Sequence, residues 1–223
     1  RKAKELGMTA LALTDNRNLY GAVEFYKECK AQGIKPIIGI DAYLSPRGRT
    51  EKTQDDRRGS RLVLLAENET GYKNLIQLVT RSYLEGFYYH PRIDRELLKE
   101  HSVGLIALVP SLQGEIPQAL RMDDKVRAER LGKEYVALFG KENVFCEITR
   151  HDGIEGHEET MRRLKDFSRD SGIPLVVAHD VAYLEHEDRP ACDTLRSVMN
   201  HGPMERGGFT DEEEDFSFVS EEK

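Results

Sequence analysis

The chain has 223 residues, with 33 Lys and Arg against 40 Asp and Glu, and a formal net charge of −7. This length corresponds to one large domain or two small ones. No apolar run approaches the roughly 18 residues that a membrane-spanning helix needs, and the three cysteines, Cys29, Cys146 and Cys192, form no CxxC pair. These features exclude a membrane-spanning protein, make a disulfide scaffold or a cysteine-based zinc finger a poor fit, and favour a reducing, cytoplasmic compartment.

The negative charge is concentrated near the carboxyl end. Residues 205–223 contain eight acids and two bases, which leaves 32 acids and 31 bases in the other 204 residues. A chain that is basic overall, as many nucleic-acid binders are, is therefore not indicated. We expect a globular domain over residues 1–204 and an acidic segment over residues 205–223.

The first part of the chain predicts two strands and a helix. Residues 1–7 are typical of the last turns of a helix closed by a glycine, and they show neither an initiator Met nor a signal-peptide pattern, so we expect a fragment that lacks its first element. An apolar run predicts a strand over 8–15, helical spacing predicts a helix over 18–33, and a second strand follows over 37–44. The polar residues 45–60 predict a mobile loop.

Four more strands are predicted at 62–66, 104–109, 144–148 and 173–178, with helices at 70–84, 95–101, 114–121, 124–139, 155–171 and 187–199. Asp94 is placed to cap the second of these helices. Six apolar strands separated by helices predict parallel βα units and an α/β fold. Polar residues after several strands suit a closed barrel, but an open doubly wound sheet would also place ligands there, so the pattern does not separate the two.

Three carboxylates and one histidine are candidate site residues. Asp15, Asp41 and Asp180 each end a predicted strand, where converging carboxylates bind Mg²⁺ or Mn²⁺. Helix capping and turn formation are the alternative reading of the same positions. His179 has the chemistry of a metal ligand or a base near neutral pH. Since adjacent residues of a strand face opposite sides, we do not expect His179 and Asp180 to line one pocket.

Two other classes of site have weaker signals. Ser111 has no GxSxG around it and no cysteine has a local signature, so a covalent hydrolase is not predicted. Residues 47–61 hold six bases and three acids, and Tyr88 and Tyr89 lie in the predicted loop 87–92. Contact with a nucleic-acid backbone is one interpretation, and a solvated loop is the other.

Long stretches of the chain resemble one family. LALTDNRNLYGAVEFYKECKAQGIKPIIGIDAYLSP and RLVLLAENETGYKNLIQLVTRSYLEGFYYHPRIDRELL are similar to the polymerase-and-histidinol-phosphatase (PHP) domain of bacterial DNA polymerase III alpha subunits, and so are residues 105–120 and 173–188. The resemblance implies a distorted seven-stranded βα barrel, TIM-like, whose first strand is missing from this chain. Members with an intact site look like metal-dependent phosphoesterases, often described as proofreading 3′–5′ exonucleases.

The resemblance also implies that the metal site is degenerate here. Asp41 and Asp180 occupy ligand positions and are retained, and Asp15 belongs to the surrounding residues. Substituted positions are Asn16 and Arg61, where the family has His, Ser111, where it has Cys, and Ala182, where it has His. Arg61 would place a positive charge where the family holds a metal ion. It is placed to pair with Asp41 or Asp180, which would hold the pocket together without metal.

We therefore expect a PHP domain with a structural role, no catalytic residue and no cofactor, inside a parent protein that synthesises DNA. Expected partners are the remaining polymerase domains, other replicase subunits and, in the intact protein, DNA, with no membrane. The first alternative is an active phosphoesterase or proofreading exonuclease that uses Asp15, Asp41, Asp180 and His179 with Mg²⁺, Zn²⁺ or Mn²⁺. The second is a non-catalytic interaction module that uses loop 45–60 or the acidic segment.

Overall fold

The computed structural model describes residues 1–151, 154–199 and 215–219. The strands are β1 Ala10–Asn16, β2 Lys35–Leu44, β3 Ser60–Ala66, β4 Leu105–Val109, β5 Val144–Ile148 and β6 Leu175–Val177. The α-helices are α1 Lys2–Glu5, α2 Ala22–Gln32, α3 Glu69–Leu84, α4 Arg95–His101, α5 Glu115–Arg121, α6 Lys125–Phe139, α7 His157–Ser171 and α8 Arg189–Met199. Three short 3-10 helices occur at Gln54–Arg57, Lys141–Asn143 and His186–Asp188. None of the helices among these residues is long and apolar enough to cross a membrane.

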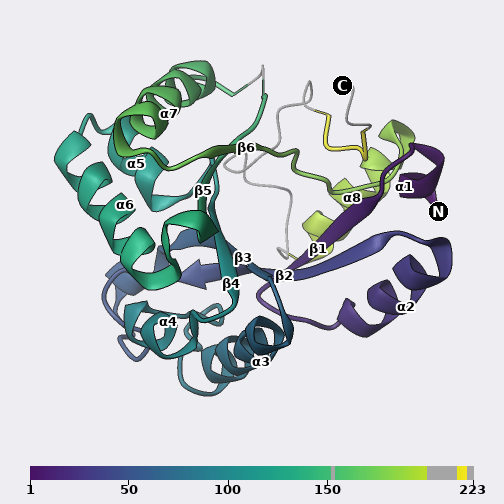
Figure 1. Cartoon of the computed structure of the whole chain (residues 1–223), viewed down its shortest axis with the longest axis horizontal. Helices are drawn as coiled ribbons and strands as arrows, with labels where there is room; N and C mark the ends of the chain where they lie inside the picture. Colours follow the sequence, from purple (N-terminus) through teal and green to yellow (C-terminus); the bar gives the residue numbers. More distant parts are fainter. Residues whose placement is uncertain (152–153, 200–214, 220–223) are drawn as a thin grey trace.

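The six strands form one curled sheet in the order β1–β2–β3–β4–β5–β6, with helices on its outside (Figure 1). The number of strands and the α/β class agree with the prediction. The expected all-parallel pairing is wrong at β3, which is antiparallel to both β2 and β4, whereas the other neighbouring pairs are parallel. A parallel partner needs a crossover connection, and the chain between β2 and β3 contains only the short 3-10 helix.

Several helix caps lie at the residues that the sequence predicts. Asp94 accepts a hydrogen bond from the Leu97 amide at 2.9 Å, which confirms the predicted cap of α4. Gly33 and Gly172 end α2 and α7 in the left-handed region, at φ of 74° and 72°, where an L side chain is strained. These caps fix where the chain leaves each helix and returns to the sheet.

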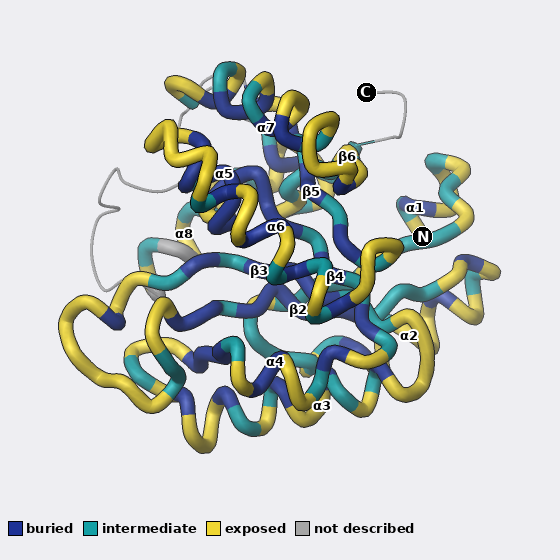
Figure 2. Tube along the Cα trace, turned by 60° about the vertical axis from the view of Figure 1, so that its left-hand side comes forward, coloured by how far each residue is buried: buried dark blue, intermediate teal, exposed yellow. Residues whose placement is uncertain are grey.

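Most of the core lies between the sheet and helices α3 to α7. The central strands β2 to β5 carry most of the buried strand residues, while exposed residues gather on the outer helix turns (Figure 2). A second, smaller cluster joins Ala3, Cys29 and Ile34, with Phe218 packed against it. The edge strands β1 and β6 are only partly covered, and Val177 of β6 is 79% exposed.

The segment 45–60 is an ordered structure rather than the mobile loop that its composition predicts. The fully buried guanidinium of Arg92 donates to the carbonyl oxygens of Gly86, Arg49, Glu51 and Asp56 at 2.7–3.1 Å. Arg49 pairs with Asp94, and Arg47 pairs with Asp56, a carboxylate of zero exposure. Arg47, Arg49 and Asp56 are therefore paired internally, whereas Arg57 and Arg58 stay exposed. Local composition does not reveal this order, because Arg92 lies more than thirty residues away in sequence.

Part of the acidic segment packs against the chain that follows β6. Residues 205–214 and 220–223 lie outside the described residues, but Phe216 and Ser217 are buried. The Phe216 carbonyl accepts a hydrogen bond from the Ala182 amide at 2.8 Å, and Ser217 forms an isolated parallel bridge with Tyr183. These contacts bring an aromatic side chain to the cavity described next.

Candidate functional site

A cavity of about 920 Å³ opens at the carboxyl ends of β1, β2, β5 and β6. Asp15, Asn16 and Arg17 enter it from the end of β1, and His179, Asp180 and Ala182 from the chain after β6. Asp41 and Arg61 come from neighbouring strands. Asp41 stands opposite Val63 in the antiparallel ladder of β2 and β3, and Arg61, two residues from Val63, shares its sheet face. This diagonal spacing lets a long side chain reach a carboxylate on the adjacent strand.

Arg61 holds the two retained carboxylates together. Its Nε lies 2.8 Å from Asp41 Oδ2, and its Nη2 lies 3.7 Å from Asp180 Oδ1. The side chains of Arg61, Asp41 and Asp180 are only 20%, 9% and 27% exposed. The expected pairing of Arg61 with these carboxylates is confirmed. A buried ion pair of this kind is costly to break, since removal of one partner leaves an uncompensated charge.

Burial controls the protonation of the acids around Arg61. It raises the pKa of Asp41, an effect that the Arg61 guanidinium only partly offsets. Burial and the negative charge of Asp180 raise the pKa of Glu147 on β5 to about 7. Burial alone would raise the pKa of Asp180, but His151, whose Nε2 lies 3.4 Å away, and the charge of Arg61 leave this pKa below the ordinary value. Three acids therefore surround the Arg61 cation, and the charge of Arg17 also acts on Asp41.

Both residues of the His179–Asp180 pair line the cavity, contrary to the expectation from strand alternation. Strand β6 ends at Val177, so the two residues lie in the following segment, where the alternating geometry of a strand does not apply. His151 also approaches Asp180, with its Nε2 3.4 Å from Asp180 Oδ2, and its ring packs 5.5 Å from that of Phe216.

The donor set does not fit a divalent cation between the carboxylates. Asp41 Oδ1 and His179 Nε2 are buried atoms without a hydrogen-bond partner among the described residues, which by themselves would suit a metal. However, the Arg61 guanidinium already lies between Asp41 and Asp180, and a cation there would meet its positive charge. Within residues 1–151, 154–199 and 215–219, no three His, Cys, Asp or Glu side chains are grouped to hold a metal ion.

The other predicted positions are spread around the site. Asn16 and Ala182 are exposed at the cavity, and neither side chain supplies a strong metal donor. Asp15 accepts a hydrogen bond from the Gly21 amide at 3.3 Å, just before α2, as its turn-forming interpretation predicts. Ser111 is fully buried outside the cavity lining, and its Oγ lies 2.7 Å from Thr149 Oγ1.

Sequence reasoning missed Glu147 as part of this site. Its carboxylate is 7% exposed, lines the cavity and accepts a long hydrogen bond of 3.4 Å from the Ser111 amide. The available signal was a lone acid inside the otherwise apolar run VFCEI, since an acid is rarely buried in a strand without a partner.

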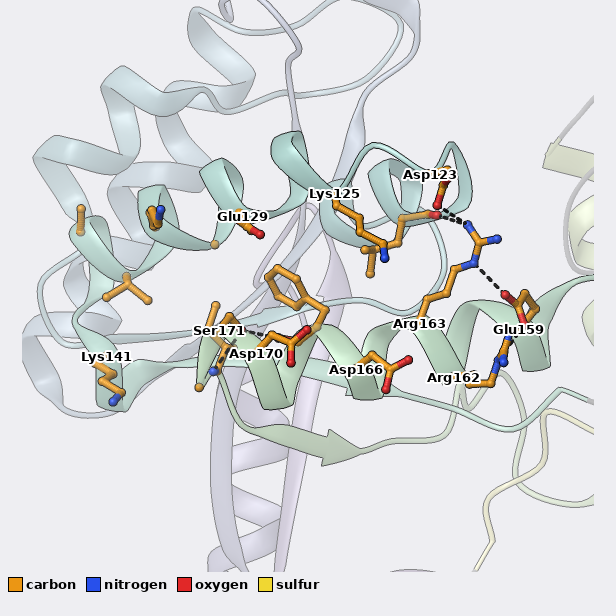
Figure 3. Close-up of a pocket in the computed structure, with 18 residues that line it drawn as sticks. Asp123, Lys125, Glu129, Lys141, Glu159, Arg162, Arg163, Asp166, Asp170 and Ser171 are labelled. Atoms are coloured by element: carbon orange, nitrogen blue, oxygen red, sulfur yellow. Dashed lines mark hydrogen bonds and ion pairs between the residues drawn. The ribbon is translucent and has the colours of Figure 1, made fainter.

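A second cavity, of about 860 Å³, lies between α6 and α7 (Figure 3). Its lining holds five bases and five acids, namely Lys125, Lys133, Lys141, Arg162, Arg163, Asp123, Glu129, Glu159, Asp166 and Asp170. Several are already paired: Arg163 contacts both Glu159 and Asp123 (Figure 3). None of the predicted site residues lies here, and the balanced charge indicates no ligand class.

Known proteins match this chain over most of its length. Residues 1–151 match the PHP domain family. DNA polymerase III subunit alpha of Treponema pallidum (strain Nichols) is 44% identical over 200 residues, covering 89% of this chain and 17% of the relative. The proteins of the same name from Thermus aquaticus and Aquifex aeolicus (strain VF5) are 43% and 35% identical, over 86% and 100% of this chain but only 16% and 20% of the relatives.

The fold is also similar to a solved amidohydrolase from Chromobacterium violaceum, whose structure holds bound sulfate and no metal. The TM-score is 0.50 at 13% identity, over 78% of this chain and 77% of the other. At this identity the similarity shows a shared fold and nothing about activity. The chain spans a fifth or less of the length of the polymerase subunits that it matches. By its sequence match over two thirds of its length, the chain belongs to the PHP domain family.

Proposed function

We propose that this chain is the PHP domain of a replicative DNA polymerase III alpha subunit, and that it has a structural role in place of a metal-dependent activity. The observation that carries the proposal is the Arg61 guanidinium, bound to Asp41 and reaching Asp180. In this proposal an internal cation replaces the metal charge, so the pocket is held without a cofactor. The identities of 35–44% to polymerase subunits support the assignment of the parent protein.

The parent protein would extend DNA in the cytoplasm, with catalytic residues outside this chain. Its partners would be the remaining polymerase domains, other replicase subunits and DNA. Asn16, Ser111 and Ala182 support the loss of the metal site, because an amide, a buried hydroxyl and a methyl group are weak or absent ligands.

A seventh strand in the intact protein is part of the proposal. Strands β1 and β6 are the two edges of the described sheet, and each carries exposed apolar residues, Ala12 and Val177. Apolar residues exposed on an edge strand suit a further strand that pairs there and closes the sheet toward a barrel. This arrangement supports the distorted seven-stranded barrel expected from the resemblance.

The experiment is metal analysis of the purified chain combined with a hydrolysis assay on DNA with a free 3′ end. We expect less than about 0.1 equivalent of Zn²⁺ or Mn²⁺ after dialysis, and no cleavage with added Mn²⁺ above the rate without protein. Stoichiometric metal together with cleavage of the 3′ end would overturn the proposal.

The second candidate is an active phosphoesterase with a rearranged site of Asp15, Asp41, Asp180 and His179. The buried, unpartnered atoms Asp41 Oδ1 and His179 Nε2 favour it. Asp41→Asn separates the two, since an enzyme would lose its cleavage whereas a structural domain has none to lose. Asp166→Asn, at an exposed carboxylate of α7 that does not line this cavity, is the matched control.

A further inference from the structure

A surface of aromatic and arginine side chains adjoins the cavity. We call it the aromatic rim and define it by Tyr20, Tyr83, Phe87, Tyr89, Arg17 and Arg57. The four rings are exposed by 38% to 81%. Large aromatic side chains are seldom gathered in solvent without a partner, so this group of residues indicates a binding surface.

Contacts link these residues in small groups around the loop 87–92. The rings of Tyr83 and Phe87 lie 6.4 Å apart, and burial together with the nearby Tyr20 hydroxyl raises the pKa of Tyr83. The Arg57 guanidinium lies 4.1 Å from the centre of the Tyr89 ring. The Arg17 guanidinium lies 5.0 Å from the Tyr43 ring and 3.3 Å from His90 Nδ1, which connects the rim to the cavity wall.

The backbone holds this surface in an unusual conformation. Arg17 and Tyr89 have φ of 62° and 59°, in the left-handed region that L side chains rarely adopt. Tyr88, whose ring packs 4.7 Å from that of Tyr89, lies 5.3 Å from the buried Arg92 guanidinium that ties the two loops together. The aromatic residues therefore stand on a rigid support, and little conformational entropy would be lost on binding.

Two arginines of the rim form no ion pair with an acid among the residues that the structure describes. The neighbouring carboxylates are already bound, Asp56 by Arg47 and both Glu85 and Asp94 by Arg49. No ion pair with a described carboxylate is formed by Arg17 or by Arg57, and each instead lies over an aromatic ring. These guanidiniums are available for an anion, and phosphate matches their geometry and charge.

We propose that the aromatic rim binds single-stranded nucleic acid, with bases stacked on Phe87 and Tyr89 and phosphates held by Arg17 and Arg57. Exposed rings beside unpaired cations are the arrangement that recognises a strand with accessible base faces. A duplex offers the phosphates but keeps its bases stacked inside, so it should bind more weakly. This inference does not rest on the proposed structural role or on the state of the metal site.

The test is fluorescence anisotropy of a labelled oligothymidylate of about 16 nucleotides, with a duplex of the same length as comparator. The variants are Tyr89→Ala, Phe87→Ala and Arg57→Ala, each checked for folding by circular dichroism. Tyr26→Ala and Lys30→Ala are matched controls, because Tyr26 on α2 is 48% exposed and also carries a cation, Lys30, 6.0 Å from its ring.

We expect the single strand to bind more tightly than the duplex, and each ring variant to raise the Kd roughly tenfold, while the controls change it less than about twofold. Arg57→Ala should also reduce the salt dependence of binding. Absence of oligonucleotide binding at low salt, or binding that the ring variants leave unchanged, would overturn the proposal. Binding of another polypeptide domain at this surface in place of the oligonucleotide would overturn it as well.

Discussion

Arg61 and Asp41 lie on neighbouring antiparallel strands, with Arg61 Nε 2.8 Å from Asp41 Oδ2 in a site that excludes most solvent. Because β3 is antiparallel to β2, the amino end of β3, which carries Arg61, lies beside the carboxyl end of β2, which carries Asp41. The Arg61 guanidinium therefore lies among the acids of the cavity. The orientation of one strand thus determines the electrostatics of the cavity.

Arg61→Met should destabilise the chain by about 2–4 kcal/mol, because Asp41 and Asp180 would remain buried without their cation. Adding Asp41→Asn to Arg61→Met should restore part of the lost stability, since the second change removes one of the buried charges left without a partner. Urea unfolding of the two single variants and the double variant measures the coupling. Arg162→Met, which breaks an exposed pair with Glu159, is the control and should cost less than about 1 kcal/mol. Equal losses at Arg61 and Arg162 would contradict the expectation.

Glu147 should make the chain less stable as the pH rises from about 4.5 to about 7. Its pKa is raised to about 7 in the folded chain, so the native state holds a proton that the unfolded state has released. The stability that this group contributes is complete below the unfolded pKa and is lost as the pH rises through the folded pKa, by about 3 kcal/mol. Glu147→Gln should flatten this part of the stability profile in urea unfolding at several pH values. An unchanged slope in the variant would count against the assignment.

Arg92→Lys should cost about 2–4 kcal/mol in the free energy of unfolding. The guanidinium serves four carbonyl oxygens, whereas an ammonium group has three donors and a different geometry, so buried acceptors would lose their partner. The loop 45–60 should become open to trypsin at Arg57 and Arg58, and limited proteolysis with mass spectrometry would detect it. Arg81→Lys, at a partly exposed pair with Glu100, supplies the comparison. A loop that stays resistant in the Arg92 variant would show that other contacts suffice.

The sequence was sufficient to predict six strands and most helix ends, because apolar runs, glycine caps and Asp94 act over a few residues. It did not reveal the direction of β3, since a buried antiparallel strand has the same apolar run as a parallel one. The order of loop 45–60 depends on Arg92, and the raised pKa of Glu147 depends on burial among Asp180, Arg61 and Asp41. Such long-range contacts arise only when distant segments meet.

We propose that Arg61 occupies the electrostatic role of a metal ion in this cavity. Isothermal titration of the purified wild-type chain with Mn²⁺ tests it most directly. We expect no saturable heat up to about 1 mM Mn²⁺, because the Arg61 cation already lies against Asp41 and Asp180 and would repel a second cation there. Stoichiometric binding with a micromolar Kd that Asp41→Asn abolishes would contradict it.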